Sequence, residues 1–311
     1  MGSLKGRDLL KLSDLSTDEV MELLDIAAQL KSGKLNPRVT VNGHPPVLGL
    51  LFYKASTRTR VSFSSAMYHL GGQVLDLPLN ATQVSRGEPI ADTARVLDRY
   101  LDILAIRTFE QSDLDTFAAE MKIPVINALT DLEHPCQILA DLQTIQETFS
   151  TLSGLTLTYV GDGNNVAHSL MIGCALVGMN VRIATPADYQ PASAIVQLTE
   201  KIANGKSEVL LTEDPIAATK GAHVVYTDVW ASMGQEDLAK SRIPIFQPYQ
   251  VNDELMGYAE KDAIVLHCLP AHRGEEITHE VIEGKQSKVW DQAENRMHAQ
   301  KALMASLLGA V

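Results

Sequence analysis

Short apolar runs alternate with helix-like stretches along most of the chain. The first helical stretch, residues 16–31, begins with Ser16 and Glu19 at the spacing of a capping box, and its apolar positions recur on one face. The apolar runs that follow have the length and composition of buried strands. They lie at residues 47–53, 73–77, 102–109, 124–129, 155–162, 181–185, 208–212, 223–230 and 263–270. Continuous apolar strands separated by helices predict parallel sheets that are covered on both faces.

A polar stretch of small residues at 147–154 divides these strands into two series. We therefore predict an α/β protein with two doubly wound parallel-sheet domains and an active-site cleft between them. The first domain is expected to span residues 1–147 and to include a C-terminal helix at 291–311, and the second to span 148–290. Because ligands of such sheets bind beyond the carboxyl ends of the strands, polar residues that follow strands are the candidate site residues.

Composition narrows the range of partners. The 311 residues carry a net charge of −12, which disfavours general binding to nucleic acid or to an anionic membrane but allows a small anionic substrate at a locally basic site. Three cysteines without CxxC spacing fit a reducing compartment, and no apolar run has the length of a membrane span. The N-terminal residues show no signal-peptide pattern, so we predict a cytoplasmic protein.

The stretch STRTR at residues 56–60 follows the first strand and opens a helix. Unpaired N–H groups in a first helical turn favour an anion, hydroxyl groups add donors, and guanidinium matches the geometry of phosphate. The turn is a candidate phosphate site, and the competing interpretation is a helix cap with solvated arginines. The sequence contains no P-loop motif, which argues against an ATP site. Arg60 is expected to brace the loop rather than to touch ligand.

The motif HPCQ at residues 134–137 opens a further helix, with Pro135 suited to its first turn. His134 and Gln137 would face ligand, and a histidine at a helix N-terminus tends to stay neutral and can donate to a carbonyl oxygen. The alternative is a histidine that only caps the helix. The buried face of this helix is expected to comprise Ile138, Leu139, Leu142 and Ile145.

Polar motifs also follow the strands of the second half. The turn GDGNN at 161–165 lacks the third glycine of a dinucleotide site, and no acidic residue ends the next strand, so a dinucleotide-dependent oxidoreductase is disfavoured. Asn165, at the start of a helix, would suit a substrate carboxylate. Asp228 ends a strand before a loop that contains Ser232 and Met233, and it would either hold an amino group or cap a helix.

The motif HCLP at 267–270 places Cys268 at another strand end. His267, Cys268 and His272 suggest zinc, but strand alternation is expected to point His267 and Cys268 to opposite faces, so we predict no metal site. A nucleophilic role for Cys268 would require a base that the sequence does not identify.

Taken together, these motifs resemble the aspartate/ornithine transcarbamylase family, and two of them, DVWASMG and HCLP, resemble its ornithine branch. The matching segments run in the family's order along essentially the whole chain: STRTR, Gln83 before RGEPIADTARVL, Arg107, HPCQ, GDGNN, DVWASMG, HCLP and ENRMHAQKA. The resemblance implies transfer of the carbamoyl group of carbamoyl phosphate to the δ-amine of L-ornithine, giving L-citrulline and phosphate in arginine biosynthesis or a urea-cycle-type step. It also implies a homotrimer or a multiple of trimers, and neither a metal nor a cofactor.

The resemblance further assigns residues to each substrate. Carbamoyl phosphate would bind Ser56, Thr57, Arg58, Thr59, Gln83, Arg107, His134, Gln137, Cys268, Leu269 and Arg296. Ornithine would bind Asn165, Asp228, Ser232 and Met233, and the catalytic residues would be Arg107, His134, Asp228 and Cys268. The nearest alternative is a transcarbamylase for a related amine such as N-acetylornithine or putrescine. A second alternative is a protein that captures an acyl phosphate without catalysis.

Overall fold

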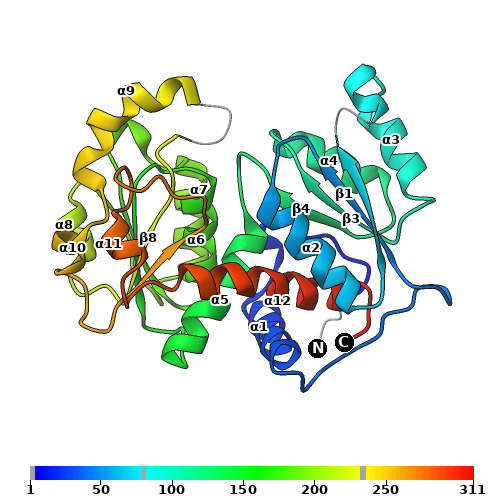
Figure 1. Ribbon diagram of the computed structural model, residues 1–311, viewed down its shortest axis with the longest axis horizontal. Coiled ribbons are helices and arrows are strands. Elements are labelled where there is room, and N and C mark those ends of the chain that lie inside the picture. The colour runs from blue at the N-terminus through cyan, green and yellow to red at the C-terminus, as the bar shows by residue number, and fades with distance from the viewer. Residues whose placement is uncertain (1–3, 79–81, 232–235) are drawn as a thin grey trace. The chain divides into compact units, whose positions relative to one another are not determined.

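The computed structural model describes residues 4–78, 82–231 and 236–311. The chain forms two compact units, one of Met1–Gln143 with Glu294–Val311 and the other of Thr144–Ala293 (Figure 1). The division falls inside two helices, α5 (Pro135–Phe149) and α12 (Val289–Leu307), each of which contributes residues to both units.

The first unit contains a four-stranded parallel sheet in the order β2-β1-β3-β4. Its strands are β1 (Val47–Phe52), β2 (Gln73–Pro78), β3 (Ile103–Arg107) and β4 (Val125–Leu129). Its remaining helices are η1 (Leu12–Asp14), α1 (Thr17–Lys31), α2 (Thr57–His69), η3 (Gln83–Arg86), α3 (Ile90–Leu97) and α4 (Gln111–Glu120). Because the chain passes from β2 at one edge back across β1 to β3, the strand order reverses between β1 and β3. Ligands of doubly wound sheets bind at such a point, and here Ser56 and Arg107 follow or end the two strands.

The second unit contains a five-stranded parallel sheet in the order β7-β6-β5-β8-β9. Its strands are β5 (Thr156–Val160), β6 (Asn180–Ala184), β7 (Val209–Thr212), β8 (Val224–Thr227) and β9 (Ile264–His267). Its helices are α6 (Asn165–Val177), η4 (Ala187–Tyr189), α7 (Ser193–Ala203), α8 (Pro215–Thr219), α9 (Glu236–Phe246), η5 (Gln247–Tyr249), α10 (Asp253–Met256) and α11 (His279–Ile282). The order reverses between β5 and β8, where the GDGNN turn and Asp228 follow the two strands.

All nine predicted strands are present, although most are shorter than their apolar runs. Two of them are not buried as predicted: β2 and β7 are edge strands, and residues such as Leu75 and Leu210 are exposed. The other two edge strands, β4 and β9, are buried, so an edge position permits exposure without requiring it, and apolar composition alone does not reveal which edge stays uncovered.

Local sequence signals explain several element boundaries. At the start of α1 the Ser16 hydroxyl accepts from the Glu19 N–H at 3.3 Å, and the Glu19 carboxylate accepts from the Ser16 N–H at 2.8 Å, so the predicted capping box is confirmed. The four predicted core positions of α5 are each at most 1% exposed: Ile138, Leu139, Leu142 and Ile145. In the part of the chain that the structure covers, no helix has the length and apolar composition needed to cross a bilayer.

Candidate functional site

The first turn of α2 carries the predicted phosphate motif. Ser56 occupies the N-cap position, but its hydroxyl makes no capping hydrogen bond, and the first turn contains no acidic side chain. Ser56 therefore begins the helix without the side-chain hydrogen bond of a hydroxyl cap. Thr57 and Arg58 are exposed, so their side chains and the N–H groups of the turn are available to an anion.

Arg60 contacts other parts of the protein instead of adding to the anion-binding groups of this turn. Its guanidinium group pairs with the Asp76 carboxylate in β2 and lies 5.2 Å from the ring centroid of Phe52 in β1. It thus ties the start of α2 to two strands, as the bracing interpretation predicted.

A buried polar cluster lies behind the α2 turn. Arg296, 3% exposed, donates hydrogen bonds to Gln137 Oε1 and, at 3.3 Å, to Thr59 Oγ1. Gln137 in turn donates through Nε2 to Asp141 at 2.8 Å. The three helices α2, α5 and α12 are thereby joined by side chains that the resemblance assigned to one ligand. A planar guanidinium group with several donors can bridge two acceptors and still present N–H groups to a ligand.

His134 and Arg107 belong to the same cationic region, and both are buried. Burial above all, followed by the positive charges of Arg296 and Arg107, holds the pKa of His134 well below its ordinary value. We expected a neutral imidazole from the helix dipole; the structure gives the same state with burial and two guanidinium groups as the cause. A neutral imidazole here can donate to a carbonyl oxygen, while the arginines supply the charge that a phosphate requires.

Two other residues of this unit lie outside the cluster. Gln83 is exposed in η3, and within the described residues its side chain makes no hydrogen bond to the cluster. Cys136 is fully buried, its thiol donates to the Asn127 carbonyl oxygen at 3.4 Å, and burial raises its pKa to about 12. Cys136 is therefore an inert core residue and not a nucleophile.

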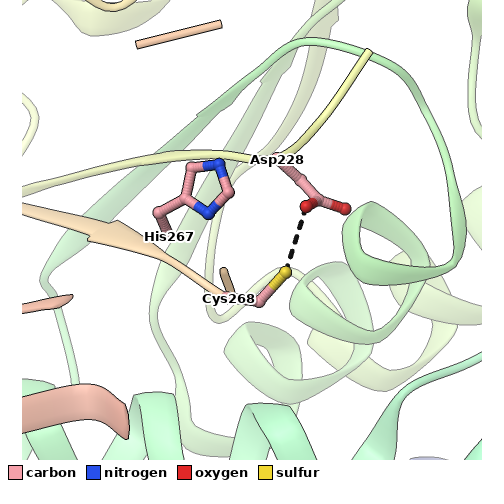
Figure 2. A group of neighbouring side chains, drawn as sticks. All are labelled: Asp228, His267 and Cys268. Atoms are coloured by element: carbon pink, nitrogen blue, oxygen red, sulfur yellow. Dashed lines mark hydrogen bonds between the residues drawn. The ribbon is translucent and has the colours of Figure 1, made fainter. Parts of the chain in front are cut away.

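In the second unit, Asp228 accepts hydrogen bonds from two sides. The thiol of Cys268 donates to Oδ1 at 3.0 Å (Figure 2), and the amide of Asn164 donates to Oδ2 at 3.0 Å. Asp228 is 6% exposed and is not the N-cap of any helix whose start the structure describes, and a buried carboxylate with free acceptor capacity can bind a cation.

Asn164 is a site residue that sequence reasoning missed. Its Oδ1 caps α6 by accepting from the N–H groups of Val166 and Ala167, and its Nδ2 orients Asp228. Asn165, the predicted ligand of a carboxylate, is the first helical residue and is half-buried. An asparagine directly before a helical pattern is a favoured N-cap, so the cap was detectable from sequence, but the contact with Asp228 was not.

A second missed feature is the ion pair between Arg242 in α9 and Asp162 in the GDGNN turn, at 2.9 Å. Arg242 also donates to the Trp230 carbonyl oxygen at 2.6 Å, and its guanidinium carbon lies 5.2 Å from the Tyr189 ring centroid. Burial raises the pKa of Asp162 to about 6 although Arg242 lowers it. The pair links α9 to the turn that holds Asn164. Its members are 80 residues apart, and no local pattern indicates the contact.

The HCLP motif differs from its predicted geometry. The ligand atoms of Asp228, His267 and Cys268 lie within 4.8 Å of one another, so the prediction that strand alternation separates His267 from Cys268 is wrong. The reason is that β9 ends at His267, and Cys268 lies beyond the pleated segment.

His267 holds the turn that carries Cys268. Its Nδ1 accepts from the Leu269 N–H at 2.8 Å, and its Nε2 lies 3.0 Å from the buried carboxylate of Glu276, to which the neutral ring donates. Leu269 has a φ of 58°, a left-handed conformation that is unfavourable for leucine and is stabilised here by that hydrogen bond. A metal ion on His267 would have to displace one of these two contacts.

The second glycine of the GDGNN turn, Gly163, has a packing explanation. A Cβ atom on Gly163 would lie 2.4 Å from the backbone nitrogen of Pro191, so no larger residue fits. Packing alone therefore explains this glycine, and no bound dinucleotide is needed to account for it.

The remaining predicted ligands of the second unit, Ser232 and Met233, lie outside the described residues.

Two doubly wound domains, with a buried cationic cluster in one and a carboxylate–thiol pair in the other, suit an enzyme that joins a phosphorylated donor to a cationic acceptor. Residues 7–147 match the carbamoyl-P binding domain of aspartate/ornithine carbamoyltransferase, and residues 153–307 match the Asp/Orn binding domain. The chain belongs to the aspartate/ornithine carbamoyltransferase family, which confirms the resemblance.

Its relatives cover the whole chain. The ornithine carbamoyltransferase of Trichormus variabilis is 70% identical over 310 residues, 100% of each chain, and that of Synechocystis sp. is 67% identical over 99% of each. The solved structure of ornithine carbamoyltransferase from Pyrococcus furiosus aligns with a TM-score of 0.95 at 48% identity over 100% of each chain. The structure of the Gloeobacter violaceus enzyme aligns with a TM-score of 0.89 at 53% identity, over 99% of this chain and 100% of the other.

Proposed function

We propose that this chain transfers the carbamoyl group of carbamoyl phosphate to the δ-amine of L-ornithine, giving L-citrulline and phosphate. The observation that carries the proposal is the full-length similarity, at 70% identity, to ornithine carbamoyltransferase. The arrangement of side chains within each unit supports it independently.

The donor would bind at the α2 turn and the cluster behind it. Ser56, Thr57, Arg58 and the first-turn N–H groups would hold the phosphate, and the guanidinium groups of Arg107 and Arg296 would balance its charge. Gln137, Thr59 and neutral His134 would hold the carbamoyl end. The electron-poor carbonyl carbon would then face the incoming amine.

The acceptor would bind at Asp228. Each carboxylate oxygen already accepts one hydrogen bond and retains capacity for another, which suits the α-ammonium group of an amino acid. Putrescine has no α-carboxylate beside an amine, and N-acetylornithine has no α-ammonium charge. Asp228 therefore favours free ornithine over both, with Asn165 facing the carboxylate.

The reaction would proceed by attack of the neutral δ-amine on the carbonyl carbon, forming a C–N bond and a tetrahedral oxyanion. Arg107, His134 and Thr59 would donate to the oxyanion, and preorganised donors of this kind commonly contribute the largest share of catalysis. The C–O bond to phosphate then breaks, Arg58 stabilises the departing anion, and the proton lost by nitrogen is balanced by protonation of phosphate. Cys268 positions the amine beside Asp228.

We further propose that the enzyme is a cytoplasmic homotrimer that serves arginine biosynthesis. Family membership supports the trimer, and three cysteines that form no disulfide support a reducing compartment. Sedimentation velocity tests the assembly: three chains of 33.9 kDa should sediment as one species, and a stable monomer would contradict the trimer.

The substrate proposal is tested by steady-state kinetics with a panel of amines. Purified protein with carbamoyl phosphate should give the highest kcat/KM with ornithine, and far lower values with putrescine and N-acetylornithine. A higher kcat/KM with either of the other amines would overturn the assignment of substrate while leaving carbamoyl transfer intact.

A further inference from the structure

The first unit contains a pocket that shares no residue with the proposed donor site. Its volume is about 610 Å³, within the usual range for small-molecule sites. It is lined by the end of α1 and the segment after it, by the end of α2 with the turn into β2, and by Lys301 of α12. It lies at the carboxyl end of α2, whereas Ser56 and its neighbours lie at the amino end.

The charged side chains that line this pocket are all basic. Arg38, His69 and Lys301 line it, and no carboxylate side chain is found among its described lining residues. The carboxyl end of α2 contributes about half a negative charge, which the two full positive charges of Arg38 and Lys301 exceed. In a chain with a net charge of −12, a pocket of this character is suited to an anion.

Lys301 is the most informative of these residues. It is 6% exposed, and its ammonium group has neither a hydrogen-bond nor an ion-pair partner among the described residues. The stem of Lys301 is buried while its ammonium group is only partly withdrawn from water, and this partial desolvation lowers the pKa of Lys301. Arg38, which is exposed, likewise has no carboxylate partner in the part of the chain that the structure covers. A ligand anion would satisfy both cations at once.

We propose that this pocket binds a small organic anion, a carboxylate or a phosphate ester, whose charged group meets Lys301 and Arg38. Leu30 and Leu35 also line the pocket and would pack against the apolar part of the ligand. The occupant would contact α2 and α12, the two helices that carry Thr59 and Arg296 of the donor cluster.

The test uses methyl NMR of the full-length protein, with the δ-methyl groups of Leu30 and Leu35 as local reporters. Phenyl phosphate and benzoate are titrated as the two anions, and benzyl alcohol as the neutral control. Either anion should shift both methyl signals in a saturable manner while benzyl alcohol should not, and the tighter of the two identifies the preferred anionic group.

Variants of the pocket residues test whether the anion binds at this pocket. Lys301→Met should weaken anion binding at this pocket roughly tenfold or more, whereas Lys34→Met, at an exposed lysine outside the pocket, should leave it unchanged. If circular dichroism shows that Lys301→Met does not fold, Arg38→Gln carries the same test. The proposal is overturned by methyl signals that neither anion shifts, by equal shifts with benzyl alcohol, or by undiminished binding in the folded variant.

Discussion

Replacing Asp228 by asparagine tests how the second unit recognises its substrate. The buried carboxylate accepts from the Cys268 thiol and from Asn164 Nδ2. In Asp228→Asn the new oxygen can still accept from the thiol, but the new amide N–H group faces the Asn164 donor, and the charge opposite the α-ammonium group is lost. A hydrogen bond to a charged group contributes about 1.5–3 kcal/mol, so kcat/KM for ornithine should fall roughly 10- to 150-fold.

The assay is steady-state citrulline formation, with ornithine varied at saturating carbamoyl phosphate. The exposed Asp262, in the same unit, provides a matched control, because Asp262→Asn removes a charge without touching the site. The double variant Asp228→Asn/Asn164→Asp restores a donor–acceptor pair and a capping oxygen for α6 but displaces the charge. It should recover thermal stability without recovering kcat/KM. Normal kcat/KM in Asp228→Asn, or full recovery in the double variant, would refute the reasoning.

Three further predictions concern buried ionisable groups. Arg296→Met removes the donor to Gln137 and Thr59, so kcat/KM for carbamoyl phosphate should fall about a hundredfold or more in steady-state assays; a fall below tenfold would contradict this role. The pKa of His134 is lowered by burial and by the nearby arginines, so its ring signals should not titrate around the ordinary histidine pKa of about 6.5 by NMR; a midpoint near 6.5 for His134 would contradict the neutral imidazole. Folding raises the pKa of Asp162 from 3.8 to about 6, so its protonated form stabilises the protein below pH 6 and this contribution is lost as pH rises through 6. In urea titrations, wild type should therefore lose about 1 kcal/mol relative to Asp162→Asn between pH 5 and 7, and identical pH dependence in the two proteins would contradict the shift.

The sequence was most informative where one local signal decides the structure. Buried parallel strands are continuous apolar runs, and a serine three residues before a glutamate marks a helix start, so the strands and the start of α1 were predictable. The exposed edges at Leu75 and Leu210 were not, because position within a sheet depends on strands far along the chain.

Some contacts of the candidate site were likewise predictable from sequence, and others were not. Motifs that follow strands pointed to Thr59 and Gln137, and the family resemblance pointed to Arg296; the structure brings the three together through direct hydrogen bonds. The Asp162–Arg242 pair joins residues with no shared local pattern, and it emerged only from the fold.

His267 shows a further limit of pattern reasoning. Alternation applies only within a strand, and the end of β9 at His267 could not be located to one residue from sequence. That single residue decides whether His267 and Cys268 lie on opposite faces or close together. Its buried contact with Glu276 then gives His267 a structural role that no motif indicated.

The most direct test of the central claim is the identity of the bond that is formed. Purified protein is incubated with ¹³C-labelled carbamoyl phosphate and ornithine labelled with ¹⁵N at the δ position, and the product is examined by NMR and mass spectrometry. The proposed function predicts citrulline with a directly bonded ¹³C–¹⁵N pair, released in equal amount with phosphate. Phosphate release without this coupling, or a carbamoyl group on the α-nitrogen, would contradict it.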